Sequence, residues 1–183
     1  MKTLLAVSAT LLGAALATSV PIVTQQPTPP APLDSALIAT FQGAWHCTGA
    51  FANGKAIESD MRFTADLDRH WLRVVHDDVP PNGYHAQSMW GADPNTGKLM
   101  AVIFDNFGGA RRFTSAGWNG KVVRFDVAAL GDSASSSVAG NAKRAERFTY
   151  TTTVNGTFRM RYEVSGDGRA TWRLGDELLC SRE

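Results

Sequence analysis

The chain has 183 residues, of which 44% are hydrophobic and 19% are charged, and it contains two cysteines. This hydrophobic content excludes disorder over the whole length, and the length fits a single domain. The 18 basic and 17 acidic side chains nearly balance and form no extended basic cluster, so we expect no nucleic-acid partner. Two cysteines are also too few for a four-cysteine zinc site.

Residues 1–17 have the pattern of a cleaved signal peptide. A short basic start at Lys2 precedes an almost wholly apolar run, and Ala15-Leu16-Ala17 is a typical cleavage motif. The run is shorter than the roughly 20 residues that span a membrane. Its removal deletes one lysine and no acid, which leaves equal numbers of basic and acidic side chains. We therefore expect export to the bacterial periplasm or the medium, with no membrane association afterwards and no charge-driven partner.

A linker and a short helix come next. Residues 18–33 contain five prolines and no charge, so they form an extended spacer. Residues 34–41 predict a helix that Asp34 or Ser35 caps and that ends before Gly43. The apolar face of this helix consists of Leu37, Ile38 and Phe41.

From Gly43 onward, short runs of period-two alternation predict strands separated by turn signals. Asn-Gly pairs at 53–54, 119–120 and 155–156 suit tight hairpins. Residues 131–141 are small and polar and predict a flexible loop. Further turns are indicated at 80–83, 93–97 and 166–168. The predicted strands are 43–51, 56–66, 70–78, 84–92, 98–105, 110–118, 121–130, 143–154, 157–165 and 169–180.

About ten strands joined almost entirely by hairpins form a meander. A meander of this size exposes two edges, and closing on itself removes both. We therefore predict an all-β fold, an up-and-down antiparallel β-barrel over residues 34–183. A two-sheet sandwich is the alternative, although its Greek-key crossovers need longer connections than most of those present.

The alternation also assigns the inward faces of four strands. In each of them, apolar residues share one parity, and charged residues alternate with them in the strands 56–66 and 157–165. The predicted inward residues are Trp45, Cys47 and Gly49; Ile57, Met61, Phe63 and Ala65; Phe158, Met160, Tyr162 and Val164; and Trp172, Leu174, Leu178 and Cys180, provided that no bulge breaks the last set.

The two cysteines lie in the first and the last predicted strand. In a closed meander these strands are neighbours, and an exported chain meets an oxidising environment. We therefore predict a Cys47–Cys180 disulfide that joins the two ends of the sheet, with two independent buried thiols as the alternative.

Several motifs resemble those of a known group of barrels. Gly43-Ala44-Trp45 is similar to the G-x-W signature of lipocalins and related calycin barrels, in which the Trp closes one end. The stretches 91–97 (GADPNTG), 103–108 (IFDNFG) and 115–120 (SAGWNG) resemble a bacterial lipocalin-like family of unknown function. The resemblance covers about residues 36–180. It implies a calycin-like barrel of about ten strands and no established activity.

The histidines give no metal-site spacing. His46, His70, His76 and His85 form neither an H-x-x-x-H nor an H-E-x-x-H motif, and no cysteine–histidine cluster is present in the sequence. Nitrobindin-like barrels, which are more distantly similar, ligate haem through a His near the C-terminus, but residues 86–183 contain no His. We therefore expect no metal, no haem and no other cofactor.

No catalytic motif is evident either, so no catalytic residue is predicted. We interpret His76-Asp77-Asp78 as a solvated strand end, because His76 and Asp77 point to opposite faces of a regular strand. His85 and Asp105 on adjacent strands are an open possibility for an acid–base pair inside the barrel. A barrel enzyme of isomerase, cyclase or hydrolase type is thus an alternative function, and so is a non-catalytic structural or protein-interaction module.

The basic doublets Arg111-Arg112 and Lys143-Arg144 have two interpretations. Both suit solvated strand ends. Alternatively, one Arg lies at the barrel mouth and binds the carboxylate of an anionic ligand in a bidentate manner.

The apolar and aromatic inward faces favour a barrel that binds a small, mainly apolar molecule. We expect the helix 34–41 and the loop 131–141 to open the site, because segments with few apolar anchors are the least stable parts of a domain. The predicted ligand-binding residues are Trp45, Met61, Phe63, Trp90, Phe158, Tyr162 and Trp172.

Overall fold

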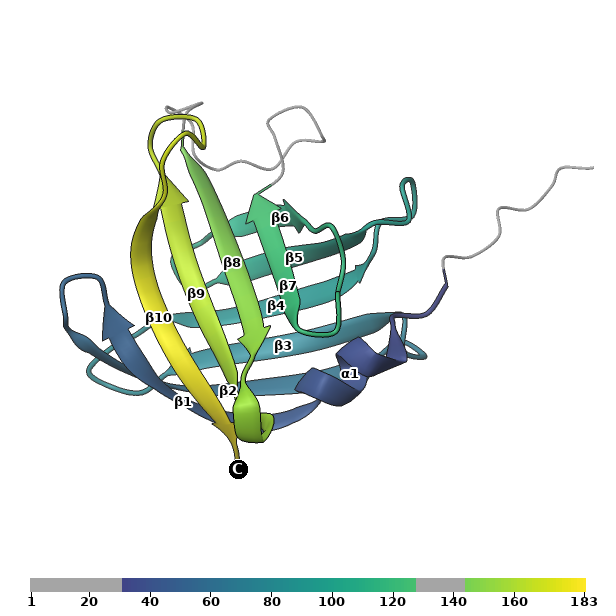
Figure 1. Ribbon diagram of the computed structural model, residues 1–183, viewed down its shortest axis with the longest axis horizontal. Coiled ribbons are helices and arrows are strands. Elements are labelled where there is room, and N and C mark those ends of the chain that lie inside the picture. The colour runs from purple at the N-terminus through teal and green to yellow at the C-terminus, as the bar shows by residue number, and fades with distance from the viewer. Residues whose placement is uncertain (1–30, 128–143) are drawn as a thin grey trace, which may run out of the picture.

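The computed structural model describes residues 31–127 and 144–183, which form a closed antiparallel barrel of ten strands preceded by a short helix (Figure 1). This confirms the predicted up-and-down barrel. The predicted signal peptide, most of the linker and the loop 131–141 lie outside the described residues. The elements are α1 (Ser35–Phe41), β1 (Gly43–Phe51), β2 (Ala56–Asp66), β3 (Trp71–Asp78), β4 (His85–Ala92), β5 (Leu99–Asp105), β6 (Ala110–Thr114), β7 (Val122–Val127), β8 (Ala145–Thr152), the 3-10 turn η1 (Val154–Gly156), β9 (Phe158–Ser165) and β10 (Arg173–Arg182).

Each strand pairs with its neighbour in sequence, and β1 pairs with β10 to close the ring. Cys47 lies directly opposite Cys180 in the β1–β10 pair, and the two residues form the predicted disulfide. Both cysteines are completely buried inside the barrel. The disulfide thus joins the first and last strands across a sequence separation of 133 residues.

Two strands each have one end four residues short of the predicted position. β6 ends at Thr114, because Ser115 turns the chain and its hydroxyl accepts a hydrogen bond from the Gly117 amide, where φ is +109°. β10 begins only at Arg173, because the Asp167 carboxylate accepts hydrogen bonds from the backbone and the hydroxyl of Thr171. The aromatic residues Trp118 and Trp172 therefore lie outside regular strands.

The helix α1 closes one end of the barrel (Figure 1). Asp34 caps it by accepting a hydrogen bond from the Ala36 amide at 2.8 Å, and its buried face is the predicted one. Phe41 is completely buried and packs edge-to-face on Trp118 of the β6–β7 connection and on Phe158 of β9. The Trp45 indole donates a hydrogen bond to the Phe41 carbonyl at 2.7 Å. This end, called the closed end below, is therefore filled by side chains.

Across the described residues, none of the helical segments has the length and apolar character needed to cross a bilayer.

Candidate functional site

The barrel interior is hollow at the end opposite α1. A cavity of about 680 Å³ opens there, between the β1–β2, β3–β4 and β5–β6 connections. Apolar side chains from β1, β2, β8, β9 and β10 form part of its wall: Phe51, Ile57, Phe148, Met160, Tyr162 and Leu178. Phe107, which is 78% exposed, stacks on Tyr84 at the rim. The cavity is thus amphipathic rather than purely apolar.

The polar part of the wall consists mainly of inward-facing residues on five strands, namely β3, β5, β6, β8 and β10. In each of these strands the inward residues are apolar toward the closed end and become charged toward the cavity. In β3, for example, Leu72 and Val74 are followed on the same face by His76 and Asp78. The charged residues that line the cavity on these strands are His76 and Asp78, Asp105, Arg111, Glu146, and Asp176.

Arg111 lies between two carboxylates. Its guanidinium donates to Asp105 at 2.7 Å and to Glu146 at 2.5 Å, and all three side chains are largely buried. Burial opposes the charged form of Arg111, but Glu146, Tyr84 and Asp105 together outweigh this effect, and the pKa of Arg111 is raised. Asp105 also accepts hydrogen bonds from the backbone amides of Phe107 and Gly109, and a Cβ at Gly109 would lie 2.6 Å from this carboxylate. The β5–β6 turn therefore positions Arg111 through Asp105. The positive charge of Arg111 is compensated by the Asp105 and Glu146 carboxylates.

A second polar group lies on β2 and β3. The Ser59 hydroxyl donates to the Asp78 carboxylate at 2.6 Å, and His76 Nε2 lies 3.3 Å from the same carboxylate oxygen. Burial alone would raise the pKa of Asp78, but His76 and Ser59 together lower it below its usual range. His76 Nε2 is buried and has no aligned hydrogen-bond partner among the described residues. The imidazole is therefore held beside a carboxylate, and its Nε2 retains unused hydrogen-bonding capacity.

Asp176 on β10 is the least satisfied of these charged groups. Its Oδ1 is buried without a hydrogen-bond partner in the described part of the chain. Burial raises the pKa of this carboxyl to about 6, while His76 lowers it and Asp78 raises it to smaller extents. Asp176 thus faces the cavity as an acid that is costly to ionise and that lacks an internal partner.

We expect Asp176→Asn to stabilise the protein at neutral pH. Because the folded pKa is about 6, against 3.8 for an ordinary Asp, the folded state holds this proton over the range where the unfolded chain loses it. The contribution of Asp176 to stability is therefore most favourable below pH 4 and falls as the pH rises to 6. Discounted for partial exposure, the penalty at pH 7 is about 2 kcal/mol.

Urea denaturation of the wild type and the variant between pH 4 and pH 8 measures this difference. The free energies of unfolding should coincide near pH 4 and diverge by about 2 kcal/mol above pH 6. A difference that is independent of pH would show that the Asp176 carboxyl titrates normally.

The structure divides the predicted ligand-binding residues into three groups. Tyr162 lines the cavity, and burial raises its pKa to about 12. Trp172 does not line the cavity. The remaining five are each at most 2% exposed and pack in the aromatic core of the closed half, where they fill space: Trp45, Met61, Phe63, Trp90 and Phe158.

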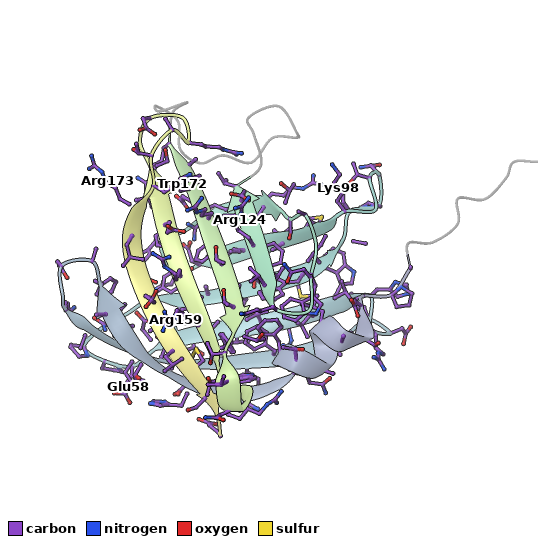
Figure 2. All side chains as sticks on the ribbon, viewed as in Figure 1. Glu58, Lys98, Arg124, Arg159, Trp172 and Arg173 are labelled. Atoms are coloured by element: carbon purple, nitrogen blue, oxygen red, sulfur yellow. A yellow bond between two sulfur atoms is a disulfide. The ribbon has the colours of Figure 1, made fainter. Side chains whose placement is uncertain are left out.

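The predicted inward position of Trp172 is wrong. The register of the β9–β10 pair shifts between Leu174 and Asp176, so the parity of Leu178 and Cys180 does not extend back to Trp172. Trp172 precedes β10, at the upper end of the molecule in Figure 2, and the Arg147 guanidinium lies 4.1 Å from its ring centroid. Asp176, not an aromatic residue, is the inward group at this end of β10.

Two further interpretations of the sequence also need correction. His76 and Asp78 are not a solvated strand end, because their side chains are only 14% and 6% exposed and line the cavity. His85 and Asp105 form no pair: His85 is exposed and bonds Asp77 at 2.9 Å, whereas Asp105 binds Arg111.

The helix 34–41, which the sequence predicts to open the site, packs at the opposite end of the barrel and does not line the cavity. The loop 131–141 lies outside the described residues. Of the two basic doublets, Arg111 and Arg144 both line the cavity, and both lie against carboxylates of the protein itself, while Arg112 binds Asp93 on the outside. Lys143 lies outside the described residues.

A larger hollow of about 1530 Å³ lies on the outer surface of β6, β7 and β8. Trp172 lines it, and its strand arginines are already paired: Arg112 with Asp93, Arg124 with Asp126 at 2.9 Å, and Arg147 with Glu163 at 2.8 Å. His46, Asp60 and Glu183 also approach one another on the outer surface, where His46 and Asp60 already bond at 3.0 Å. Arg112 Nε and Trp118 Nε1, from residues that line the larger hollow, are also buried without a hydrogen-bond partner among the described residues, but this hollow lies outside the barrel.

In comparisons with known proteins, no protein-family model matches the chain, and no curated protein matches it significantly. The class of protein is therefore defined by the structure: a ten-stranded antiparallel barrel, closed by a disulfide, plugged at one end and hollow at the other.

Proposed function

We propose that the protein binds a small molecule in the hollow half of its barrel. The observation that carries this proposal is an amphipathic cavity of about 680 Å³ into which unpartnered polar atoms point. Ligand pockets in proteins commonly enclose about 300–1,000 Å³ and combine apolar walls with a few fixed polar groups. The ligand in this proposal has an apolar body and a polar group, which revises the mainly apolar ligand expected from the sequence.

The composition of the cavity wall supports a ligand that has both an apolar body and a polar group. Phe148 and Tyr162 stack with ring centroids 4.8 Å apart, and with Met160 and Leu178 they offer an apolar wall. Two polar groups of the cavity wall, His76 on β3 and Asp176 on β10, keep hydrogen-bonding capacity that the described residues do not use. A molecule with one polar end can satisfy these groups and bury its body against the rings.

Titration with N-phenyl-1-naphthylamine, a neutral fluorescent probe, tests the proposal. We expect saturable binding to the wild type and a loss of at least about tenfold in affinity for Ile57→Trp, because the larger side chain fills the cavity. Ile57 is 5% exposed and lines the cavity, whereas its neighbour Glu58 is 55% exposed on the outer face of β2 and is labelled in Figure 2. Glu58→Trp is therefore the matched control and should bind like the wild type.

Circular dichroism establishes that both variants are folded. If Ile57→Trp does not fold, Leu178→Phe takes its place as a smaller filling substitution in the same wall. Absence of saturable binding to the folded wild type, or equal binding by the filled variant, would contradict the proposal.

The proposal includes export of the chain and kinship with lipocalin-like barrels. Export is supported by the signal-peptide pattern of residues 1–17 together with the disulfide, which suits an oxidising compartment. The lipocalin-like assignment is supported by the buried position of Trp45 at the plugged end, where the resemblance places the G-x-W tryptophan.

A barrel enzyme is the second candidate, and one observation favours it. His76, held beside Asp78, and Asp176, whose pKa is raised by burial to about 6, face the same cavity and have the character of an acid–base pair. Native mass spectrometry of protein purified from its source distinguishes the candidates. A binding protein should carry the same small molecule in the wild type and in His76→Gln, whereas an enzyme should retain a different, unconverted molecule in the variant.

The same spectrum gives the mass of the chain, and a mass matching residues 1–183 would contradict cleavage of the signal peptide.

A further inference from the structure

We propose that the cavity selects ligands with a cationic group, such as a primary amine on an apolar body, and that Asp176 is the residue that binds this group. The inference rests on the proposed function and narrows it to a class of ligand. It follows from the charges around the cavity, from the partners that each charge already has, and from the position of Asp176 beside the apolar wall.

Carboxylates outnumber buried cations among the described residues of the cavity wall. Four carboxylates line it: Asp78, Asp105, Glu146 and Asp176. Arg111 is the buried guanidinium, and Asp105 and Glu146 already bind it. The other titratable groups that line the cavity are His76, Tyr84, Tyr162, Lys55 and Arg144.

The two remaining cations belong to the rim. The Arg144 side chain is 52% exposed and lies 3.5 Å from Glu146, and Lys55 is an exposed residue of the β1–β2 hairpin whose Nζ lies 5.8 Å from the centroid of the Phe51 ring. Burial raises the pKa values of Tyr84 and Tyr162 to about 12, so both remain neutral. In the described part of the chain, the buried wall therefore contains four carboxylates and one guanidinium, and an ionised Asp176 adds to the excess of negative charge.

The partners of Asp78 and Asp176 differ. Asp78 accepts the Ser59 hydroxyl and lies beside His76, so its charge is compensated locally. The buried Oδ1 of Asp176 accepts no hydrogen bond from the described residues. A buried carboxylate without a partner is costly, and a cationic donor from the ligand removes this cost while forming a charge-assisted hydrogen bond. Asp176 is therefore the preferred place for a positive charge.

Asp176 also lies next to the apolar wall. It pairs with Tyr162 on β9 and with Phe51 on β1, so an aromatic side chain flanks it on each neighbouring strand. Gly175 lets the chain pass close to the Tyr162 ring, because a Cβ there would lie 2.6 Å from a ring carbon. An amine bound to Asp176 would thus leave its apolar body in contact with these rings, where burial and cation–π attraction both contribute.

Three probes that share one apolar body test the inference: 1-naphthylmethylamine, 1-naphthylmethanol and 1-naphthoic acid. They carry a cation, a neutral hydroxyl and an anion, and isothermal titration calorimetry at pH 7.5 measures each affinity. We expect the amine to bind the wild type at least about tenfold more tightly than the alcohol, and the acid to bind most weakly.

Asp176→Asn should abolish the preference for the amine and leave the affinity for the alcohol within about twofold, because only the charge is lost. Glu177→Gln is the matched control: it removes one carboxylate from the adjacent, outward-facing position of β10, where Glu177 pairs with Arg159 and Arg161. The control should keep the preference. The preference of the wild type should also shrink as the pH falls below 6, where Asp176 becomes protonated.

The outcomes separate this inference from the proposed function. An amine preference that disappears in Asp176→Asn and persists in Glu177→Gln supports it. Binding of N-phenyl-1-naphthylamine without an amine preference, or a preference that survives in Asp176→Asn, overturns the inference and leaves the binding function intact. Failure of all four probes to bind the folded wild type overturns both.

Discussion

Loss of the Cys47–Cys180 disulfide is expected to lower the free energy of unfolding by about 5 kcal/mol on the loop-entropy model. The bond joins residues separated by 133 positions, so it restricts almost the whole domain in the unfolded state. It also joins β1 to β10, the pair that closes the barrel. Equilibrium urea denaturation with and without reductant, after both samples have been unfolded and refolded, measures the change.

Unfolding first is necessary because both cysteines are completely buried and a reductant cannot reach them in the folded state. Cys47→Ala with Cys180→Ala provides the same comparison without reductant, and thiol titration in urea verifies the redox state of each sample. Equal urea midpoints for the oxidised and reduced proteins would show that pairing of β1 with β10 closes the barrel without help from the bond.

Much of the fold could be predicted from the sequence because hairpin signals and alternation are local. The bounds of β1 and β2 agree with those expected from residues 43–51 and 56–66, and Asn-Gly pairs lie in the turns as predicted. Closure could be inferred because a meander leaves two edges and the cysteines lie on them. These features depend on neighbouring residues and on the order of strands, both of which a single sequence contains.

The site was harder to predict because its signal is distributed over strands that are distant in sequence. His76, Asp105 and Glu146 each look like a charged residue near a strand end, and such residues are usually solvated. Each nevertheless shares the inward parity of its strand, as Asp105 does with Ala101 and Ile103. Aligning the inward stripes by their predicted turns, rather than reading each strand alone, would have placed these charges at one end of the barrel.

Asp176 shares its parity with Leu178 and Cys180, so alternation alone places it on the inward face of the last strand. The position of Trp172 could not be predicted in this way. The register shift at Gly175 reverses the relation between Trp172 and Leu178, and a bulge of this kind depends on packing against Tyr162 on the neighbouring strand. The position of α1 in the end of the barrel could not be predicted either, because it also depends on tertiary packing. The apolar face of α1 was predicted, but only the closed barrel shows that Phe41 enters its end and fills the space assigned to a ligand.

Replacing Phe41 with Ala is expected to lower the free energy of unfolding by about 3–5 kcal/mol. Phe41 is completely buried, and its ring lies within 5.3–6.1 Å of the ring centroids of five aromatic residues. The deletion leaves a cavity that these rings cannot fill without breaking their own edge-to-face contacts. Urea denaturation measures the loss, and Phe104→Ala, at a position on β5 that is 53% exposed, should change the stability by less than about 1 kcal/mol.

The same variant tests whether the two halves of the barrel have separate roles. Phe41 lies at the closed end and does not line the cavity, so folded Phe41→Ala should bind N-phenyl-1-naphthylamine with wild-type affinity. The stability loss and the unchanged binding together would show that the aromatic core supports the fold and that the ligand contacts the opposite half. A stability loss no larger than that of Phe104→Ala would mean that α1 is not an essential plug. Weakened binding in the folded variant would instead place the probe among the closed-end aromatic residues, as the sequence alone had suggested.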